Sequence, residues 1–430
     1  MNKYKRYERY KDSGIGWIGE IPEEWNIKKL KWLCSISTGN KDTINKVDDG
    51  EYPFFVRSPI VERISTYSYD GEAVLTAGDG VGVGKVFHYI NGKFDYHQRV
   101  YKFSDFKNVS GKYFYYYIKE NFIKETEVNN AKSTVDSIRL PMIKQFPVTI
   151  PSKEEQTKVV DFLDKKTTET DGLIADKEKL IELLQEKRQA IITEAVTKGL
   201  NPNVKMKDSG VEWIGEIPEH WILSKIKYVS LINNKTLSES TDDDYEIDYI
   251  DISSVTSIGE IDGIQRLNFK DAPSRARRIL SKGDTIVSTV RTYLKAIAFI
   301  ENVQSNLICS TGFAVLTPLS KVVPKYLFYL MRSEKYVNEI VRRSVGVSYP
   351  AINASDIGAL ECAIPNKDEQ KYIVEYLDNC TTQIDQLVND IQTQIQKLKE
   401  YRQSLISEAV TGKIDVREFQ NKNEVIFRNE

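Results

Sequence analysis

The chain has 430 residues, of which 40% are hydrophobic and 28% are charged. These are ordinary values for a soluble globular protein of two to four domains. The net charge of −2 excludes a uniformly basic surface, so any nucleic-acid site has to concentrate its positive charge locally. No apolar run approaches the ~18 residues that span a bilayer, and the first residues, MNKYKRYERYKDSG, lack the apolar core of a signal peptide. We therefore expect a cytoplasmic protein without membrane contact.

A short block that occurs twice is the first recognisable element. Residues 11–25 read KDSGIGWIGEIPEEW and residues 207–221 read KDSGVEWIGEIPEHW, so that twelve of fifteen positions are identical. Each copy carries tryptophans on both sides of GEIPE, which is typical of an aromatic-anchored packing segment. We predict a structural role for both copies rather than a ligand site.

Residues 26–150 predict a mixed α/β globular domain. This segment is rich in Tyr, Phe, Val and Gly, and the alternating runs at residues 85–89 and 99–103 are typical of β-strands. An aromatic run at residues 112–116 predicts a short helix near the end of the domain. The glycine-rich residues 78–85 do not match the GxxxxGKS/T phosphate-loop pattern, so we interpret them as a turn between two strands.

Three places in this domain are candidate contacts with nucleic acid. Arg and Gln often form paired hydrogen bonds with guanine and adenine in the major groove, and a His-Gln-Arg triplet stands at one strand start. A polar strand end that faces solvent explains this triplet equally well. A lysine after exposed glycines can reach a phosphate, and a polar loop precedes the next helix. The candidates are Lys85, His97, Gln98, Arg99, Lys132 and Ser133.

A long amphipathic helix is predicted over residues 151–200. A proline and Ser152, the expected N-cap, precede the helical pattern, and Gly199 falls just after its end. The apolar stripe is interrupted at Thr170 and Lys177. The residues expected to pack this stripe are Leu163, Leu173, Leu184 and Ile191.

After a linker at residues 201–206, residues 207–364 predict a second domain with the same texture. Strand-like runs occur at residues 285–290 and 313–316, and an aromatic run at residues 325–329 predicts a short helix. Arginine dominates its cationic clusters, which favours planar recognition of bases and phosphates. A solvated charged surface is the alternative interpretation. The candidate contacts are Arg275, Arg277, Arg278, Arg291, Tyr293, Lys295, Arg342, Arg343, Ser348 and Tyr349.

A second long helix is predicted over residues 365–412, followed by a tail at residues 413–430. Residues 365–411 share 22 of 47 positions with residues 151–197, including the opening Glu-Gln and the closing Glu-Ala-Val-Thr. Neither helix can bury its stripe alone in water, so we expect them to pair as a coiled coil. Two unrelated solvent-exposed helices are the alternative. The stripe of the second helix contains Leu377, Ile384, Ile391, Leu398 and Leu405.

Catalytic motifs are missing from the sequence. The three histidines have no HExxH or related metal-ligand spacing, and the four cysteines form no CxxC pair. No GxSxG elbow and no NPPY-like or DPPF-like methyltransferase motif occurs. The acidic residues show no nuclease-like spacing. We therefore expect no metal site and no catalytic residue.

Together, these parts resemble the specificity (S) subunit of type I restriction-modification systems. The resemblance rests on the WIGEIPExW blocks at Trp17 and Trp213, the openings at Gln156 and Gln370, and the RQ and EAVT endings of both helices. It covers nearly the whole chain. The two domains differ in sequence while the blocks and helices repeat, which favours two unlike readers on one repeated frame.

The resemblance implies an α+β fold of two target recognition domains, at residues 1–150 and 207–364, separated by two long antiparallel helices with pseudo-twofold symmetry. Each domain would read one half of a split, asymmetric site on double-stranded DNA. The helices would set the gap between half-sites and dock two methyltransferase (M) subunits, with restriction (R) subunits added. No cofactor is expected on this chain, whereas S-adenosylmethionine, ATP and Mg²⁺ are expected on the partners. A stand-alone nuclease and a sequence-blind scaffold are the competing hypotheses.

Overall fold

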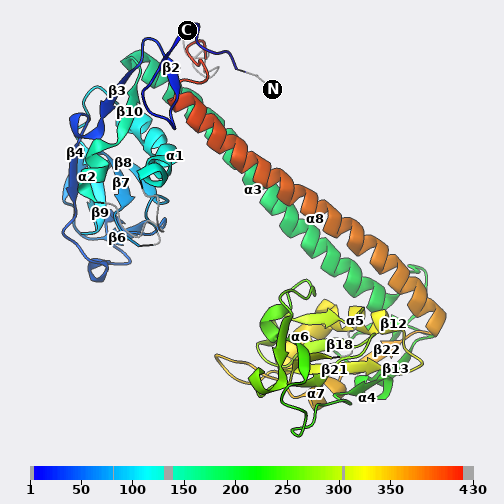
Figure 1. The fold of residues 1–430 in the computed structure, drawn as a ribbon. Coiled ribbons are helices and arrows are strands. Elements are labelled where there is room, and N and C mark those ends of the chain that lie inside the picture. Colours follow the sequence, from blue (N-terminus) through cyan, green and yellow to red (C-terminus); the bar gives the residue numbers. More distant parts are fainter. Residues whose placement is uncertain (1–3, 81, 130–138, 303–305, 420–430) are drawn as a thin grey trace. The chain divides into compact units, whose positions relative to one another are not determined.

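The computed structural model describes residues 4–80, 82–129, 139–302 and 306–419 (Figure 1). It contains two compact units. One is formed by Met1–Glu178 with Thr393–Glu430, and the other by Lys179–Gln392.

Two long helices are shared between the units. The helix α3 (Lys153–Lys198) and the helix α8 (Lys367–Val410) each give one segment to either unit. Each unit therefore combines a globular α/β domain with a pair of helix segments, and the two-domain α+β fold predicted from the sequence is confirmed.

A six-stranded sheet forms the framework of the first domain. Its strand order is β4-β9-β7-β8-β5-β6, in which β5 pairs with β8 in parallel and the other neighbours are antiparallel. The helix α1 (Gly111–Asn129) packs its tyrosines and phenylalanines on β7 and β8. The strands are β4 (Ser35–Thr38), β5 (Tyr52–Phe55), β6 (Glu62–Ile64), β7 (Tyr69–Ala77), β8 (Phe87–Tyr96) and β9 (Val100–Ser104).

Two small antiparallel strand pairs connect this domain to its helices. The first repeated block folds as β1 (Tyr10–Asp12) paired with β2 (Glu20–Pro22), and its Trp25 is buried. The strands β3 (Asn26–Lys29) and β10 (Pro147–Ile150) pair at the domain base, after the short helix α2 (Leu140–Gln145). The packing role predicted for the tryptophan block agrees with this burial.

The helix segments of the first unit run antiparallel. Arg402 Nε of α8 lies 2.8 Å from an Asp171 carboxylate oxygen of α3, and Lys177 donates to Gln394 at 2.6 Å. Residue numbers rise along one helix as they fall along the other. Lys177, which interrupts the apolar stripe, thus makes a polar contact between the two helices.

Most of the residues predicted to pack the helix pair are buried. Leu163, Leu377, Ile384, Ile391 and Leu405 are buried, and Leu184, Ile191 and Leu398 are half-buried. Leu173 is 51% exposed, and its predicted packing is wrong. The buried line of α3 instead contains Thr167, Thr170 and Ile174, because the Thr170 hydroxyl satisfies itself on the Lys166 carbonyl at 2.7 Å and can enter the seam.

The second domain has two four-stranded sheets in place of one larger sheet. Their orders are β14-β21-β18-β19 and β16-β15-β20-β17, and β15 pairs with β20 in parallel. The strands are β14 (Ser230–Ile232), β15 (Glu246–Ile250), β16 (Gln265–Asn268), β17 (Ala276–Ile279), β18 (Thr285–Ser288), β19 (Ile297–Phe299), β20 (Leu307–Ser310) and β21 (Phe313–Pro318).

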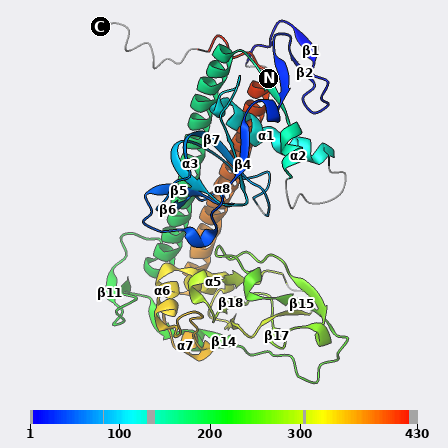
Figure 2. The same ribbon diagram turned by 90° about the vertical axis from the view of Figure 1, so that its left-hand side faces the viewer.

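Helices and hairpins complete the second unit. The helix α5 (Pro324–Arg332) packs on β18 and β19, and α6 (Glu334–Arg343) follows it (Figure 2). The repeated block again forms a hairpin, β11 (Met206–Asp208) with β12 (Glu216–Pro218), and two strands from opposite ends of the domain sequence again pair at its base. The remaining elements are α4 (Ile226–Val229), α7 (Ala354–Gly358), β13 (Ile222–Lys225) and β22 (Glu361–Ile364).

Equivalent glutamines fasten each domain to the start of a long helix. Gln156 accepts a hydrogen bond from the Ser110 backbone N–H at 2.8 Å, and Gln370 accepts one from the Val323 N–H at 2.7 Å. Both side chains are buried, and their amides donate to nearby carbonyls. The repeated Glu-Gln opening is therefore a structural joint, since a buried backbone N–H needs a partner.

The caps predicted for the first long helix are confirmed, and the second long helix has equivalent ones. Ser152 Oγ accepts the Glu155 N–H at 3.2 Å, and Asn366 Oδ1 accepts the Glu369 N–H at 3.0 Å. Gly199 and Gly412 follow the helix ends with φ of 76° and 72°, a left-handed conformation that favours glycine.

The described segments nearest the N- and C-termini pack together in the first unit. The Asp415 N–H donates to the Lys5 carbonyl at 2.8 Å, and the ring of Phe419 packs edge-on against Phe162 at 5.1 Å. Ile414 and Val416 are buried. In the second unit, the linker after Gly199 leads directly from α3 to β11.

Candidate nucleic-acid interface

A concavity lies beside the parallel strand pair of the first domain. Its volume is about 700 Å³. Two loops form most of its wall, one after β5 and one between β7 and β8, and loops at strand ends are common places for binding residues. The lining residues are Thr43, Val56, Arg57, Ser58, Pro59, Asp79, Gly80, Gly82, Lys85 and Val86.

Asp79 joins two arginines at the mouth of this concavity. Arg57 Nη1 donates to Asp79 Oδ1 at 2.9 Å, and Arg99 Nη1 donates to Oδ2 at 3.0 Å. The arginine side chains are 42% and 57% exposed. Both guanidinium groups are thus fixed by one carboxylate and still reach solvent.

His97 is not placed to contact a ligand. Its side chain is only 4% exposed, its Nδ1 accepts the Arg99 N–H at 3.0 Å, and burial lowers its pKa. The DNA contact predicted for His97 is therefore not supported, because the ring instead fixes the backbone that presents Arg99. Gln98 donates to Asp42 at 2.7 Å and remains exposed.

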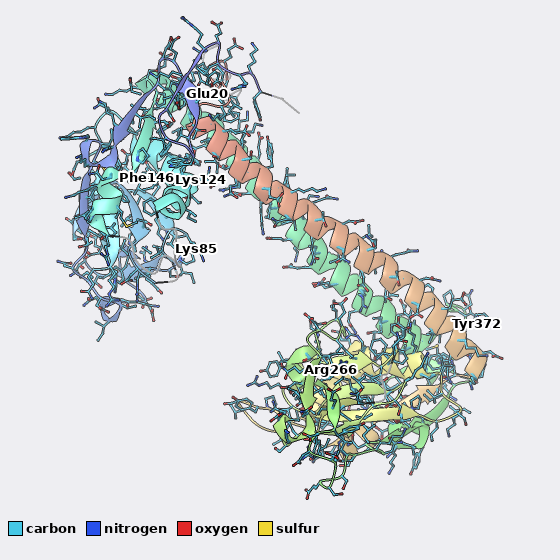
Figure 3. The ribbon with its side chains drawn as sticks, viewed as in Figure 1. Glu20, Lys85, Lys124, Phe146, Arg266 and Tyr372 are labelled. Carbon is cyan, nitrogen blue, oxygen red and sulfur yellow. The ribbon has the colours of Figure 1, made fainter. Side chains whose placement is uncertain are left out.

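Lys85 lines the concavity and is exposed (Figure 3). It belongs to the glycine-rich loop, which joins β7 to β8 as the sequence predicts. Lys132 and Ser133, the other two candidates of this domain, lie outside the described residues.

A second concavity occupies the equivalent place in the second domain. Its volume is about 530 Å³. It lies beside the parallel pair of β15 and β20, and its wall comes from the loop after β15 and the loop between β18 and β19. The lining residues are Asp251, Ile252, Ser253, Val255, Ser257, Arg275, Val290, Arg291, Leu294, Ala296 and Tyr349.

Arg291 is held in a strained conformation in this wall. Its φ is 51° and that of Lys295 is 57°, values that cost a non-glycine residue energy and are often found at functional sites. The Arg291 guanidinium stacks on the Tyr349 ring at 4.4 Å, and the backbone N–H of Arg291 donates to the Pro350 carbonyl at 2.8 Å. These contacts join the two loops that carry the predicted residues.

Arg275 enters the same concavity from the segment before β17. Its Nη2 donates to Asp251 at 2.8 Å and its Nε to the Tyr249 hydroxyl at 3.3 Å. The second domain therefore repeats one feature of the first, an arginine fixed by an aspartate. The structure brings together Arg275, Arg291 and Tyr349 among the predicted residues.

The other predicted residues of the second domain have varied surroundings. Arg277 stacks on Phe269 at 4.5 Å, and Arg278 donates to Thr236 at 3.1 Å. Tyr293, Lys295 and Ser348 are exposed beside the concavity's loops.

Arg342 and Arg343 both bind the buried Glu339 at 2.7 Å. These hydrogen bonds, that of Arg342 first, lower the pKa of Glu339. Part of the donor capacity of both arginines is thus used inside the protein. Their predicted contact with DNA stays a prediction.

Sequence reasoning missed Arg57, Asp79 and Asp251. The aspartates lie 20 or more positions from their arginines, so no local spacing connects them. A carboxylate after one strand and an arginine after the next could have suggested a pair only once the strand order was known.

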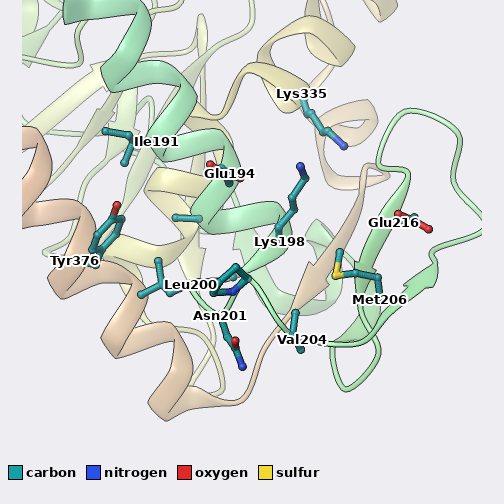
Figure 4. Close-up of a pocket in the computed structure, with 13 residues that line it drawn as sticks. Ile191, Glu194, Lys198, Leu200, Asn201, Val204, Met206, Glu216, Lys335 and Tyr376 are labelled. Atoms are coloured by element: carbon teal, nitrogen blue, oxygen red, sulfur yellow. The ribbon is translucent and has the colours of Figure 1, made fainter.

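A third cavity of about 650 Å³ lies where α3 ends in the second unit (Figure 4). Lys198, Lys335, Glu194 and Glu216 place mixed charges around it, and Tyr376 and Leu200 add apolar surface. In the first unit, Phe162 is the residue equivalent to Tyr376, and Tyr4 and Phe419 cover it.

Within the described ranges, no group of three or more His, Cys, Asp or Glu side chains could hold a metal ion. Among the helices of those ranges, none is both long and apolar enough to cross a membrane. The linings of the two concavities together contain arginine and lysine side chains and the Tyr349 ring.

Comparison with known proteins places these features in a family. The family described as type I restriction modification DNA specificity domain matches residues 22–183 and again residues 218–397. The two matches cover both domains and most of both helices, in agreement with the internal repeat.

Two curated relatives extend over nearly the same length. The type I restriction enzyme EcoDI specificity subunit of Escherichia coli is 24% identical over 92% of this chain and 90% of its own. The type I restriction enzyme MjaVIII specificity subunit of Methanocaldococcus jannaschii is 22% identical over 92% of this chain and 94% of its own.

A solved structure shares the fold. This structure, which concerns complex assembly and conformational transition of the type I R-M system, covers 91% of this chain and 98% of its own, with a TM-score of 0.66 and 15% identity. The repeated frame, the two matched halves and the full-length relatives agree, and the chain belongs to the family of type I restriction-modification specificity subunits.

Proposed function

We propose that the chain binds a bipartite, asymmetric site on double-stranded DNA, with one half-site read by each domain. The single observation that carries this proposal is the pair of equivalent concavities with unlike linings. The first holds Arg57, Asp79 and Lys85, and the second holds Arg291 and Tyr349. Equivalent positions favour one task, and different side chains favour different base sequences.

The partners of the proposed complex carry the chemistry. Two M subunits would supply S-adenosylmethionine and adenine methylation, and R subunits would supply ATP-driven translocation and cleavage with Mg²⁺. The chain itself would contribute sequence recognition and docking surfaces on its long helices. The absence of catalytic motifs from the sequence supports this division.

A domain exchange tests the proposal. Residues 26–150 are replaced by the same segment of a relative, the chain is expressed with its M subunit, and methylated adenines are mapped across the genome. We expect one half of the methylated motif to change and the other half to persist. A change in both halves, or in neither, contradicts the division of labour.

The helices allow a second test. Lengthening a long helix by whole turns should alter the spacer between half-sites while both half-sequences stay the same. Sequence-blind methylation or binding in the wild-type complex would instead favour a scaffold.

A further inference from the structure

Arg57, Asp79 and Arg99 form a cluster in the first domain, and its role as inferred below rests on the proposed function. Arg57 follows β5, Asp79 lies between β7 and β8, and Arg99 immediately precedes β9. Arg57 and Asp79 line a cavity of about 700 Å³, and Arg99, which comes from a third loop, joins them through its hydrogen bond to Asp79.

Asp79 occupies one hydrogen-bond donor of each arginine. Each guanidinium gives Nη1 to the carboxylate, and an arginine has five N–H donors, so further donors remain for a ligand. A free arginine loses about 2 kcal/mol of side-chain entropy when it is ordered. The ion pairs order both side chains before any ligand arrives, which favours a geometrically exact partner.

The chemistry of a guanine edge matches these donors. In the major groove, guanine presents two acceptors, N7 and O6, which a guanidinium can bind together, and the paired cytosine presents an amino donor. Asp79, which is 28% exposed, offers an acceptor between the two donor groups. A phosphate offers acceptors only, so the carboxylate disfavours it and favours a base pair.

Lys85 provides the contrast within the same cavity. Its flexible ammonium suits a phosphate as a point charge, and it follows the glycine-rich turn. We propose that Arg57 and Arg99, both fixed by Asp79, read guanine in the half-site of the first domain.

The test uses the whole complex of this chain with its M subunit. Methylated motifs are mapped for the wild type, Arg57→Gln, Arg99→Gln and the conservative Arg57→Lys and Arg99→Lys. Arg139→Gln, which removes the same charge from an exposed residue at the start of α2, is the matched control.

We expect the wild-type half-site of the first domain to contain guanine. Each glutamine variant should lose discrimination at a guanine position by roughly 10- to 100-fold, and the other half-site should stay unchanged. The lysine variants keep the charge but lose the paired donors, so they should relax the same position. The control should keep the wild-type motif.

Binding measured against salt separates base from phosphate contacts. A lost phosphate contact lowers the salt slope by about one unit and weakens binding to all sequences alike. If the glutamine variants behave in that way while the thermal midpoint is unchanged, the proposal is overturned. It is also overturned for any arginine whose lysine and glutamine variants both retain the wild-type motif.

Failure of the inference and failure of the proposed function give different maps. A wild-type complex without a bipartite motif contradicts the proposed function. A bipartite motif that lacks guanine in the half exchanged with residues 26–150 contradicts this inference alone.

Discussion

Arg188 of α3 donates Nε and Nη2 to the two carboxylate oxygens of Asp385 of α8, at 3.0 and 3.2 Å. The arginine side chain is only 13% exposed, so these two hydrogen bonds to Asp385, rather than water, stabilise its positive charge. We predict that Asp385→Ala lowers the free energy of unfolding by about 1–3 kcal/mol, as expected for a buried donor left without its partner.

Urea unfolding measures this effect. Glu182→Ala is the matched control, because its ion pair with Lys179 lies within α3 and both side chains are 62% exposed. Such a pair contributes less than about 1 kcal/mol. Equal losses in both variants would contradict a special role for the Arg188 fork.

Glu339 should make the stability of the second unit depend on pH. Its pKa is lowered from 4.5 by hydrogen bonds from Arg342 and Arg343. A carboxyl group whose pKa is lower in the folded state than in the unfolded state contributes fully to stability when the pH is above its unfolded-state pKa. This contribution is lost as the pH falls through the folded-state pKa.

We therefore predict that stability declines below about pH 4.5 and that Glu339→Gln makes this part of the profile flatter. Thermal unfolding between pH 3 and pH 7 tests the prediction. Glu334→Gln, at the exposed start of the same helix, should leave the profile unchanged.

Two glycines should respond to alanine in opposite directions. Gly412 has φ of 72°, and a Cβ there would lie 2.3 Å from Pro22 Cδ. Gly172 lies inside α3, and a Cβ there would meet nothing within 4 Å. We predict that Gly412→Ala destabilises the first unit by more than 1 kcal/mol, whereas Gly172→Ala stabilises it by about 0.5–1 kcal/mol. Guanidinium unfolding of both variants gives the comparison.

The segment after α8 should be part of the first unit's core. Ile414 is 5% exposed and Val416 is 2% exposed. Removing a buried aliphatic side chain costs about 2–5 kcal/mol, so Ile414→Ala should lower the unfolding free energy by that amount.

Glu418→Ala is the control for this segment, since Glu418 meets Lys5 in an ion pair with both side chains at least 77% exposed. A loss below 1 kcal/mol for Ile414→Ala would mean that the segment does not support the domain. Differential scanning calorimetry can report both variants.

The repeat made much of the fold predictable. The caps at Ser152 and Asn366 and the glycines after both helices are local signals, and local signals survive in a single sequence. The prediction for Leu173 is wrong because the apolar pattern alone does not decide which of two neighbouring rows of α3 residues is buried. The buried row contains Thr167 and Thr170, whose hydroxyls donate to carbonyls of their own helix.

The candidate site was less predictable because the residues that form its contacts, such as Asp79 and Arg57, are far apart in the sequence.

The tryptophan block also forms different hydrogen bonds in its two copies. Trp221 donates to Glu369 at 3.0 Å, whereas among the described residues Trp25 Nε1 has no partner. The equivalent Glu155 accepts the Tyr7 hydroxyl at 2.6 Å instead. The two copies of the motif therefore form different hydrogen bonds, because the residues around each copy differ.

The packing of the segments nearest the N- and C-termini has a consequence for how the fold is encoded. In the first unit, the segment after α8 meets the segment before β1 through the hydrogen bond between Asp415 and Lys5. In the second unit, the equivalent connection, from the end of α3 to β11, is made covalently by the residues after Gly199. The contacts of the first unit thus do not depend on the order in which its two segments follow one another along the chain. A circularly permuted chain that connects the Lys5 and Asp415 segments through a short peptide and begins within residues 201–205 should keep the fold, as circular dichroism and thermal unfolding would report.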